Sequence, residues 1–311
     1  MEKRLKVIID TDMGDDIDDA FALLFAMKLN FDIIGITTVF ENTEQRARMT
    51  KKLLAAYGGG YESVPVFAGC GTPLAKEARA YPDLCQYTPD IDSDGYKPDS
   101  VDENDAINFI IDSCRKYKEE LTVIAIGPFT NMARVIERDK DALNLAREVV
   151  IMGGAFYKQY SDWNVICDVE AADVMFRGVK NIKCLGADVT HKLQLDKNDD
   201  ERILSADSSE AVKYVSLIYS KWKAATGKPA GVLHDPLAIL YAKDRTVCTY
   251  EESAVAVITE GYARGFTLNV NAYSKSIYNT AYSDFDFENK HTLAKEVERA
   301  RVICEFMKCF D

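Results

Sequence analysis

Residues 5–29 read LKVIIDTDMGDDIDDAFALLFAMKL, which is an apolar run, an acidic segment and a second apolar run. The first run, Leu5–Asp10, is rich in β-branched residues and predicts a strand that is covered on both faces. The second run, Ile17–Leu29, predicts an apolar helix. Six of the eleven residues from 10 to 20 are aspartates. In an open α/β sheet this segment would lie beyond the carboxyl end of the strand, where such folds bind ligands.

The same alternation of strand and helix continues over the first 190 residues. Further strands are predicted at Asp32–Val39, Val64–Ala68, Leu121–Ile126, Glu148–Met152 and Asn181–Leu185. Further helices are predicted at Thr43–Tyr57, Glu103–Tyr117 and Asn131–Glu137. This order favours a parallel sheet with helices on both faces, because parallel strands need crossover connections. We therefore predict an α/β fold: a single large domain, residues 1–311, with a mostly parallel central sheet flanked by helices.

Two regions depart from this pattern. Residues 76–101 contain three prolines and five aspartates without an apolar period, which predicts a flexible loop near the site rather than a domain linker. The last third of the chain predicts a helix at Glu210–Thr226, another after His234, a hairpin of Ser253–Thr259 with Gly265–Val270, and a closing helix from about His291.

The composition narrows the class of partner. Of the 311 residues, 47% are hydrophobic and 28% charged, as in soluble globular proteins. The 38 basic and 50 acidic residues give a net charge of −12, which disfavours nucleic acids and anionic membranes and favours a neutral small molecule or a cation. We find no transmembrane or signal-peptide segment in the sequence. The eight cysteines form no Cys-x-x-Cys pair and predict buried free thiols in a reducing cytoplasm.

The acidic segment predicts a cation site. Carboxylates packed this closely repel one another unless a cation neutralises some of them, and hard oxygen ligands select Ca²⁺ or Mg²⁺. Helix capping and a solvated turn would account for the later aspartates but not for Asp10 and Asp12, which belong to the strand end. An EF-hand is excluded, because Gly14 stands at loop position five and Phe21 replaces the bidentate glutamate.

Two further segments could complete such a site. Gly127–Asn131 follows a predicted strand directly, which would free the carbonyl of Ile126 at the end of the sheet to ligate a metal. Asp162 and Asn164 are two apart on extended chain, so they would point the same way and suit two neighbouring hydroxyls. Each segment alone is also explained by ordinary strand-end or loop structure.

Histidine is scarce in this chain, which has three. His234 precedes Asp235 and Pro236 at a predicted helix start, so Asp235 could simply cap that helix, or His234 could act in proton transfer. His191 offers a weaker signal, and His291 is predicted to be an exposed residue at a helix start.

Taken in this order, these segments resemble the inosine–uridine preferring nucleoside hydrolase family over nearly the whole chain. The aspartate-rich segment is the most specific motif, and the others are Ile36–Val39 leading to Asn42, Val64–Val66, Ile126–Asn131, Val149–Gly154 and His234–Pro236. The resemblance implies Ca²⁺-dependent hydrolysis of the N-glycosidic bond of ribonucleosides to a free base and ribose. It also implies a homodimer or homotetramer.

The resemblance assigns roles to residues of this chain. The implied Ca²⁺ ligands are Asp12, Asp19, Asp235 and the carbonyl of Ile126. Asp12 would also be the general base that takes a proton from water, and His234 would protonate the leaving base. The implied ribose contacts are Asp18 and Asn164 at the 2′- and 3′-hydroxyls, with Asn42 and Asp162 as further sugar contacts. Asp10 would support these groups from behind.

The chain also departs from the family pattern. Met13 replaces the usual proline, and two extra residues separate Gly14 from the Asp18–Asp19 pair. This insertion leaves two registers open, with Asp15–Asp16 competing for the metal and ribose roles. We prefer Asp18–Asp19, because this pair directly precedes the apolar helix. A second pocket histidine, found near position 80 in some purine-accepting relatives, is absent from residues 76–101, so the base preference stays open.

Two other functions are compatible with parts of the sequence. A haloacid-dehalogenase-like phosphatase would use Asp10 and Asp12 with Mg²⁺, but Gly14 stands where that class usually has threonine or valine, and His234 would have no role. A ribose- or nucleoside-binding relative with weak or no turnover would keep the same pocket residues.

Overall fold

A twisted sheet lies at the centre of the computed structural model, which describes residues 4–74, 84–88, 91, 93–271 and 289–311. Its eight strands follow the order β3 (Val66–Ala68), β2 (Asp32–Thr38), β1 (Lys6–Thr11), β4 (Leu121–Ala125), β5 (Glu148–Met152), β6 (Lys183–Leu185), β10 (His291–Val297) and β7 (Cys248–Ser253). Neighbouring strands are parallel except β10 and β7. The predicted α/β fold with a mostly parallel sheet is therefore confirmed.

The strand order reverses at β1. This strand pairs with β2 on one side, Asp10 opposite Thr37, and with β4 on the other, Asp10 opposite Ala125. The chain leaves the two strands β1 and β4 on either side of a topological switch point, the usual place for a ligand in an open α/β sheet. Asp12 and Ile126 are the residues that follow these two strands.

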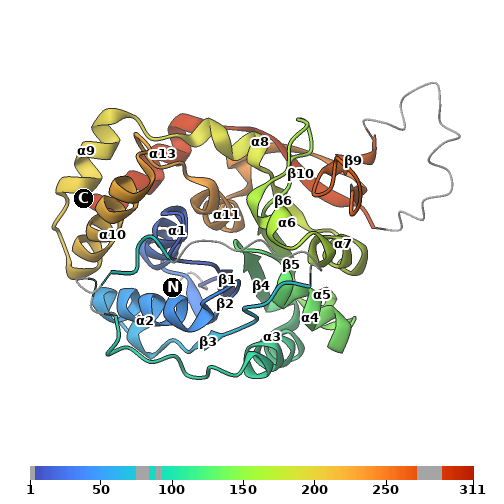
Figure 1. Ribbon diagram of the computed structural model, residues 1–311, viewed down its shortest axis with the longest axis horizontal. Coiled ribbons are helices and arrows are strands. Elements are labelled where there is room, and N and C mark those ends of the chain that lie inside the picture. The colour runs from blue at the N-terminus through green and yellow to red at the C-terminus, as the bar shows by residue number, and fades with distance from the viewer. Residues whose placement is uncertain (1–3, 75–83, 89–90, 92, 272–288) are drawn as a thin grey trace, which may run out of the picture.

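Side chains of β1 alternate between two hydrophobic cores. Val7 and Ile9 belong to the core beneath α1 (Asp18–Lys28), α2 (Thr43–Tyr57), α10 (Glu210–Thr226), α11 (His234–Lys243) and α13 (Arg299–Met307). Ile8 belongs to the core beneath α3 (Glu103–Tyr117), α4 (Thr130–Arg138), α5 (Ala142–Leu145) and α7 (Val169–Gly178). The sheet is thus covered on both faces, as Figure 1 shows.

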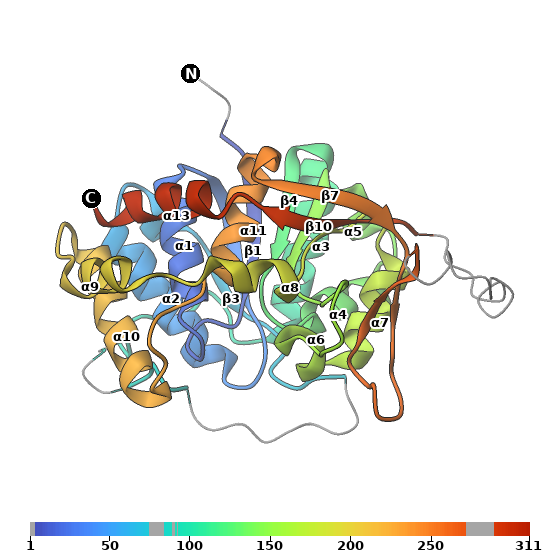
Figure 2. The same cartoon turned by 90° about the horizontal axis from the view of Figure 1, so that it is seen from above.

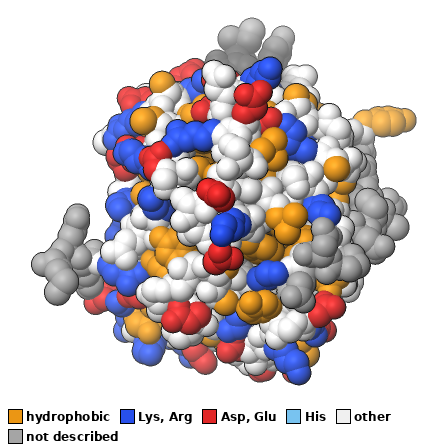
Figure 3. All heavy atoms as spheres, turned by 90° about the vertical axis from the view of Figure 1, so that its left-hand side faces the viewer, with side chains coloured by type: hydrophobic (Ala, Val, Ile, Leu, Met, Phe, Trp, Pro, Cys, Tyr) orange, Lys and Arg blue, Asp and Glu red, His pale blue; other side chains and the backbone are white. Residues whose placement is uncertain are grey.

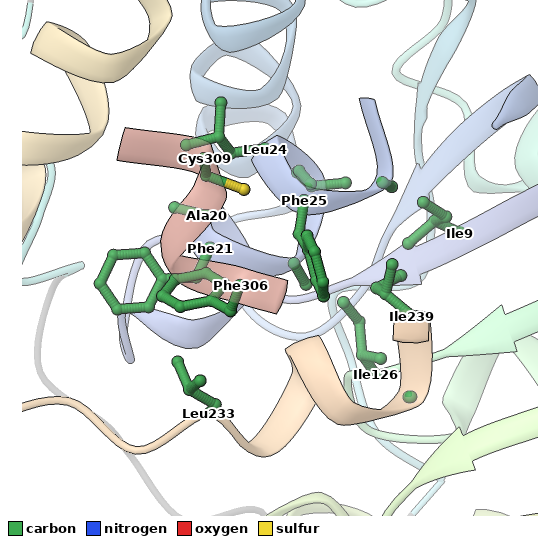
Figure 4. Packing of buried hydrophobic residues seen from close by; sticks show 14 of the residues in the cluster. Ile9, Ala20, Phe21, Leu24, Phe25, Ile126, Leu233, Ile239, Phe306 and Cys309 are labelled. Atoms are coloured by element: carbon green, nitrogen blue, oxygen red, sulfur yellow. The ribbon is translucent and has the colours of Figure 1, made fainter. Parts of the chain in front are cut away.

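Helix α1 is buried on all sides, which explains its apolar sequence. The rings of Phe21 and Phe25 contact Phe306 of α13 at centroid distances of 5.1 and 5.7 Å, and Leu233 packs nearby (Figure 4). Because α1 begins directly after the acidic segment, this packing fixes the position of the carboxylates at its start.

The C-terminal part corrects the sequence prediction. His291 begins strand β10 rather than a helix and is 1% exposed, and the closing helix α13 starts only at Arg299. Figure 2 shows β10 beside β7, with α13 following it. Pairing with both β6 and β7 overrides the local helix propensity of the Leu-Ala-Lys-Glu segment, which the sequence alone could not reveal.

Other predictions in the second half have mixed outcomes. Helix α10 has the predicted bounds, and β8 (Val255–Val257) pairs with β9 (Thr267–Asn269) as an antiparallel hairpin, as predicted. The prediction did not include β7 or α9 (Lys197–Ser205). Shorter helices that were also not predicted are α6 (Trp163–Cys167) and α8 (Ala187–Thr190).

Part of the segment 76–101 packs against the acidic segment. The backbone N–H of Gln86 donates to the carbonyl of Gly14 at 3.1 Å, and its side-chain amide donates to the carbonyl of Asp16 at 2.5 Å. Residues 75–83, 89–90 and 92 lie outside the described residues, and the predicted flexibility of the segment stays a prediction.

The surface and the cysteines agree with the composition. All eight cysteines are free, as predicted, and six of them are buried. The prediction of burial was wrong for Cys304, which is exposed, and for Cys85, which is half-buried. On the face shown in Figure 3, acidic and basic side chains are interspersed, and no continuous basic stripe is visible there. Within the described part of the chain, every helix is too short or too polar to cross a membrane.

His291 links the fold to pH. Its Nδ1 accepts the N–H of Ile182 at 3.2 Å, so its Nε2 carries the proton and donates to the carbonyl of Phe176 at 3.1 Å. Burial lowers the pKa of His291 to about 4. A charged ring would point an N–H at another N–H, so the folded state holds the neutral form.

The substitution His291→Asn is therefore expected to flatten the pH dependence of stability. The folded pKa of about 4 lies below the ordinary value of ~6.5, so the stabilisation is complete above pH ~6.5 and is lost as the pH falls toward 4. At ~1.4 kcal/mol per pKa unit, the wild type loses about 2 kcal/mol through this group between pH ~7.5 and ~5. Denaturant unfolding at both pH values measures this difference. An equal pH dependence in both proteins would contradict the role of His291.

Candidate active site

A pocket of about 570 Å³ opens at the carboxyl ends of the central strands. Its lining residues come from segments far apart in the sequence: Asp12, Asp15, Asp16, Asp18, Asp19, Ile126, Met152, Tyr160, Ser161, Asp162, Trp163, Asn164, Ile166, Ala187, His191, Trp222, Thr226, Lys228, His234 and Asp235. Most of the residues predicted for the site lie together in this list. Among the predicted site residues, Asn42 and Asp10 do not line this pocket.

Arg46 of α2 holds the acidic segment in place. Its guanidinium is fully buried and donates to the backbone carbonyls of Phe40, Asp12 and Met13 and to the carboxylate of Asp15, the last at 2.7 Å. A buried charge needs such complete pairing to be tolerated. The sequence analysis missed Arg46, because a single arginine in a helix normally indicates a solvated position.

The inserted aspartates, Asp15 and Asp16, each form an ion pair with a basic side chain. Asp15 pairs with Arg46, and Asp16 pairs with the Lys228 ammonium at 3.1 Å. Asp18 and Asp19 instead lie beside Asp235 of α11, and ligand oxygens of these three residues are all within 4.8 Å of one another. This geometry favours the Asp18–Asp19 register over the Asp15–Asp16 register.

Hydrogen bonds orient the clustered carboxylates. Asp19 Oδ1 accepts from the Thr11 hydroxyl at 2.5 Å and from the backbone N–H of Asp12 at 3.1 Å. Asp18 Oδ2 accepts the backbone N–H of Asp235 at 3.4 Å. The carboxylates are therefore positioned by the protein itself, as expected of a preformed binding site.

The electrostatics of the cluster call for a cation. Burial raises the pKa of Asp12, Asp18, Asp19 and Asp235 well above the ordinary range, and repulsion between these carboxylates raises it further. A divalent cation would relieve both costs at once. The oxygen donors of the cluster fit a hard ion such as Ca²⁺ or Mg²⁺.

Ile126 and Asn164 contact each other at the pocket. The side-chain N–H₂ of Asn164 donates to the carbonyl of Ile126 at 2.6 Å and to that of Met152 at 3.1 Å. A Cβ on Gly127 would lie 2.9 Å from Asp12 Oδ1, so only glycine lets this turn approach the carboxylate so closely. The carbonyl predicted as a ligand is thus at the pocket, in contact with Asn164.

Asp10 lies behind the pocket. Its Oδ1 accepts from the hydroxyl of Thr37 at 2.5 Å and from the side-chain amide of Asn131 at 2.7 Å. Burial raises its pKa to about 7, and its Oδ2 has no hydrogen-bond partner among the described residues. Asn131 therefore has a structural role in the Gly127–Asn131 motif, since it ties Asp10 to the start of α4.

His234 stands at the start of α11 next to the cluster. Its Nδ1 shares a hydrogen bond of 2.6 Å with the hydroxyl of Thr190, and its ring lies 4.9 Å from that of His191 in an edge-to-face arrangement. Burial, and then the proximity of His191, lowers the pKa of His234 to about 4. The ring is accordingly neutral near pH 7.

Of the two further predicted sugar contacts, Asp162 lines the pocket and Asn42 does not. Asp162 lines the pocket and caps α6, where it accepts the N–H of Val165 at 3.3 Å, and burial raises its pKa to about 6. Asn42 is exposed and caps α2, where it accepts the N–H of Gln45 at 3.2 Å. A sugar contact by Asn42 stays a prediction that this geometry does not support.

Several lining residues were not predicted. Tyr160, Trp222, Thr226 and Lys228 reach the pocket, and His191 joins them from the segment after α8. The α10 residue Trp222 is 1% exposed and resembles an ordinary core residue in the sequence. Its position next to the pocket depends on the packing of α10 beside α2, which no local motif indicates.

The fold and the acidic pocket define a nucleoside hydrolase. The chain superposes on a plant nucleoside hydrolase with a TM-score of 0.80 and 28% identity, covering 99% of both chains. A purine-preferring ribonucleoside hydrolase from Gardnerella vaginalis gives a TM-score of 0.77 at 25% identity, covering 98% of both chains.

The protein belongs to the inosine-uridine preferring nucleoside hydrolase family, whose model matches residues 7–305. Uridine nucleosidase 1 of Arabidopsis thaliana is 31% identical over 277 residues, covering 86% of this chain and 82% of the relative. The inosine-uridine preferring nucleoside hydrolase of Leishmania major is 28% identical over 267 residues, covering 82% and 84%. The protein is thus a glycosidase of a metal-dependent family, and the resemblance seen in its sequence is confirmed.

A Ca²⁺ titration tests which aspartates bind the metal. Saturating Ca²⁺ is expected to raise the melting temperature of chelator-treated protein, because a ligand at about 100 times its Kd stabilises the folded state by about 2.7 kcal/mol. Asp19→Asn is expected to abolish most of this rise. Asp16→Asn is the matched control and should keep it. The reverse pattern would assign the metal to the Asp15–Asp16 register.

Proposed function

We propose that this protein hydrolyses the N-glycosidic bond of ribonucleosides with the aid of Ca²⁺, giving the free base and ribose. The observation that carries the proposal is the buried cluster of Asp18, Asp19 and Asp235 beside His234 in one pocket. Asp12, Asp19, Asp235 and the carbonyl of Ile126 would hold the ion. When bound, Ca²⁺ would neutralise the cluster, acidify a water molecule and orient it toward the sugar.

The negative pocket suits the charge that develops on the substrate. Cleavage of the C1′–N bond gives the ribose oxocarbenium character, and nearby carboxylates stabilise that positive charge. Asp18 and Asn164 would hold two ribose hydroxyls, with Asp162 as a further sugar contact. Fixed hydroxyls place C1′ at a constant distance from the attacking water, which lowers the entropic part of the barrier.

Proton transfers then complete the reaction. Asp12 would act as the general base and take the proton of the attacking water. His234, fixed by Thr190, would donate a hydrogen bond from its ring N–H to the leaving base. Because a neutral ring that lost its proton would become an imidazolate, the ring would take up a second proton from solvent as negative charge builds on the base and pass that proton on. In sum, the OH of water goes to C1′ and a proton goes to the base.

The geometry disfavours the phosphatase alternative. A haloacid-dehalogenase-like enzyme would need an accessible strand-end nucleophile, whereas Asp10 is fully buried and hydrogen-bonded to Thr37 and Asn131. A binding protein without turnover would keep the same pocket. Turnover separates that reading from ours.

Location and assembly complete the proposal. Eight free thiols fit a reducing compartment, so we place the protein in the cytoplasm. We also propose a homodimer or homotetramer, which light scattering of the purified protein would test.

Sugar release from a panel of purine and pyrimidine ribonucleosides tests the proposed reaction. Release in phosphate-free buffer that stops with a chelator and returns with Ca²⁺ would support hydrolysis and rank the bases. No release from any nucleoside by folded, Ca²⁺-loaded protein would contradict it and favour a binding protein.

Asp12→Asn isolates the general base. The substitution keeps the shape of the side chain and removes its basicity, so we expect kcat to fall by about 10²- to 10⁴-fold. Nucleoside binding, measured by calorimetry in the presence of Ca²⁺, is expected to survive. An unchanged kcat would mean that another group takes the proton.

A further inference from the structure

Lys228 is the single lysine or arginine among the described residues that line the pocket. The same lining contains seven aspartates: Asp12, Asp15, Asp16, Asp18, Asp19, Asp162 and Asp235. A carboxylate-rich wall suits the cationic sugar, and an ammonium group near C1′ would oppose that charge. The ammonium group of Lys228 is therefore unsuited to contact the sugar. The part of the substrate that it suits is the leaving base, which becomes negative.

Two segments hold the Lys228 side chain. Its Nζ lies 3.1 Å from Asp16 Oδ2 and 5.2 Å from the centroid of the Trp222 ring. Gly227, in the left-handed conformation with φ of 67°, ends α10 and turns the chain just before Lys228. Asp16 belongs to the two-residue insertion. The insertion therefore supplies the counterion of Lys228.

The ammonium group keeps capacity for a ligand. An ammonium has three N–H donors, and the contact with Asp16 uses one of them. The side chain of Lys228 is 54% exposed, so its charge is not sequestered in the interior. A substrate can thus engage Lys228 without breaking its contact with Asp16.

Lys228 lines the same pocket as His234, the residue that we assign to the leaving base. The rings of Tyr160, His191 and His234 form a row, with centroid distances of 5.8 Å and 4.9 Å between neighbours. Burial and then the charge of Lys158 lower the pKa of His191, and the charge of Lys228 contributes in the same direction. The lysine and this aromatic row therefore line the same pocket.

The chemistry of the leaving group then defines the role of the lysine. When the C1′–N bond breaks, its electron pair goes to the base nitrogen. In a keto base the negative charge then spreads onto the exocyclic carbonyl oxygens. An ammonium at such an oxygen stabilises that charge until the base nitrogen takes up a proton. An amino group at the same edge presents N–H donors and would be repelled.

We propose that Lys228, held by Asp16 and Trp222, is a specificity-determining residue that binds the keto oxygen of the leaving nucleobase and stabilises its developing negative charge. This inference rests on the proposed function for its kinetic part. It predicts that the protein prefers keto over amino bases, because the segment after α10 contributes a positive charge.

Lys228→Met tests the inference, since methionine keeps the unbranched stem and removes the charge. We expect kcat/KM to fall about 10- to 100-fold for inosine and uridine, which carry a keto oxygen at C6 and C4, respectively, and much less for adenosine and cytidine, which carry an amino group there. The nitrophenyl riboside, whose leaving group is already stable as an anion, should also change little. Lys213→Met is the matched control, because Lys213 is on the exposed side of α10, the helix that precedes Lys228, and pairs with Glu210. Lys228→Arg should restore part of the loss.

An equilibrium measurement separates this inference from the proposed function. Binding of free hypoxanthine and adenine is measured by calorimetry for wild type and Lys228→Met. A selective loss of hypoxanthine binding would support the inference even if wild type released no sugar, an outcome that would defeat only the proposed function. An equal loss for keto and amino bases, or none, in a variant with a wild-type melting temperature would overturn the inference.

Discussion

Mutual repulsion among buried carboxylates is the constraint around which this structure is organised. Asp12, Asp18, Asp19 and Asp235 are almost completely buried and lie in one pocket, where burial and at least one other of these carboxylates raise the pKa of each. Such a cluster is costly for folding unless a cation or a cationic substrate compensates it. The surrounding contacts serve to hold these groups together: α1 is packed on every side, and Thr11 and backbone N–H groups fix the carboxylates.

Two basic side chains form ion pairs with the inserted aspartates, Asp15 and Asp16. Arg46 neutralises Asp15 inside the protein and binds the carbonyls of the acidic segment, and Lys228 neutralises Asp16 at the pocket. As a result, the longer loop leaves the Asp18–Asp19 pair at the helix start. Asp16 of the insertion thus pairs with Lys228, whereas Asp18 and Asp19 lie beside Asp235.

The sequence predicts the sheet and the carboxylate side of the site well for a physical reason. Continuous apolar strands followed by polar residues identify the carboxyl edge of a parallel sheet, and that edge brings Asp12 and Ile126 together. The base side could not be predicted in this way, because Trp222 and Lys228 reach it through helix packing. His291 was wrongly placed, since pairing between distant strands is invisible to local propensity. Asn42 shows the opposite limit: its motif is present, but its side chain caps a helix.

The most direct test of the central claim is to locate the ion by anomalous diffraction from Ca²⁺-soaked crystals. We predict one strong peak about 2.3–2.6 Å from carboxylate oxygens of Asp19 and Asp235, at the pocket wall formed by the Ile126 carbonyl. A peak at the Asp15–Asp16 pair, or an empty cluster at saturating Ca²⁺, would contradict the claim that these buried carboxylates form the metal centre.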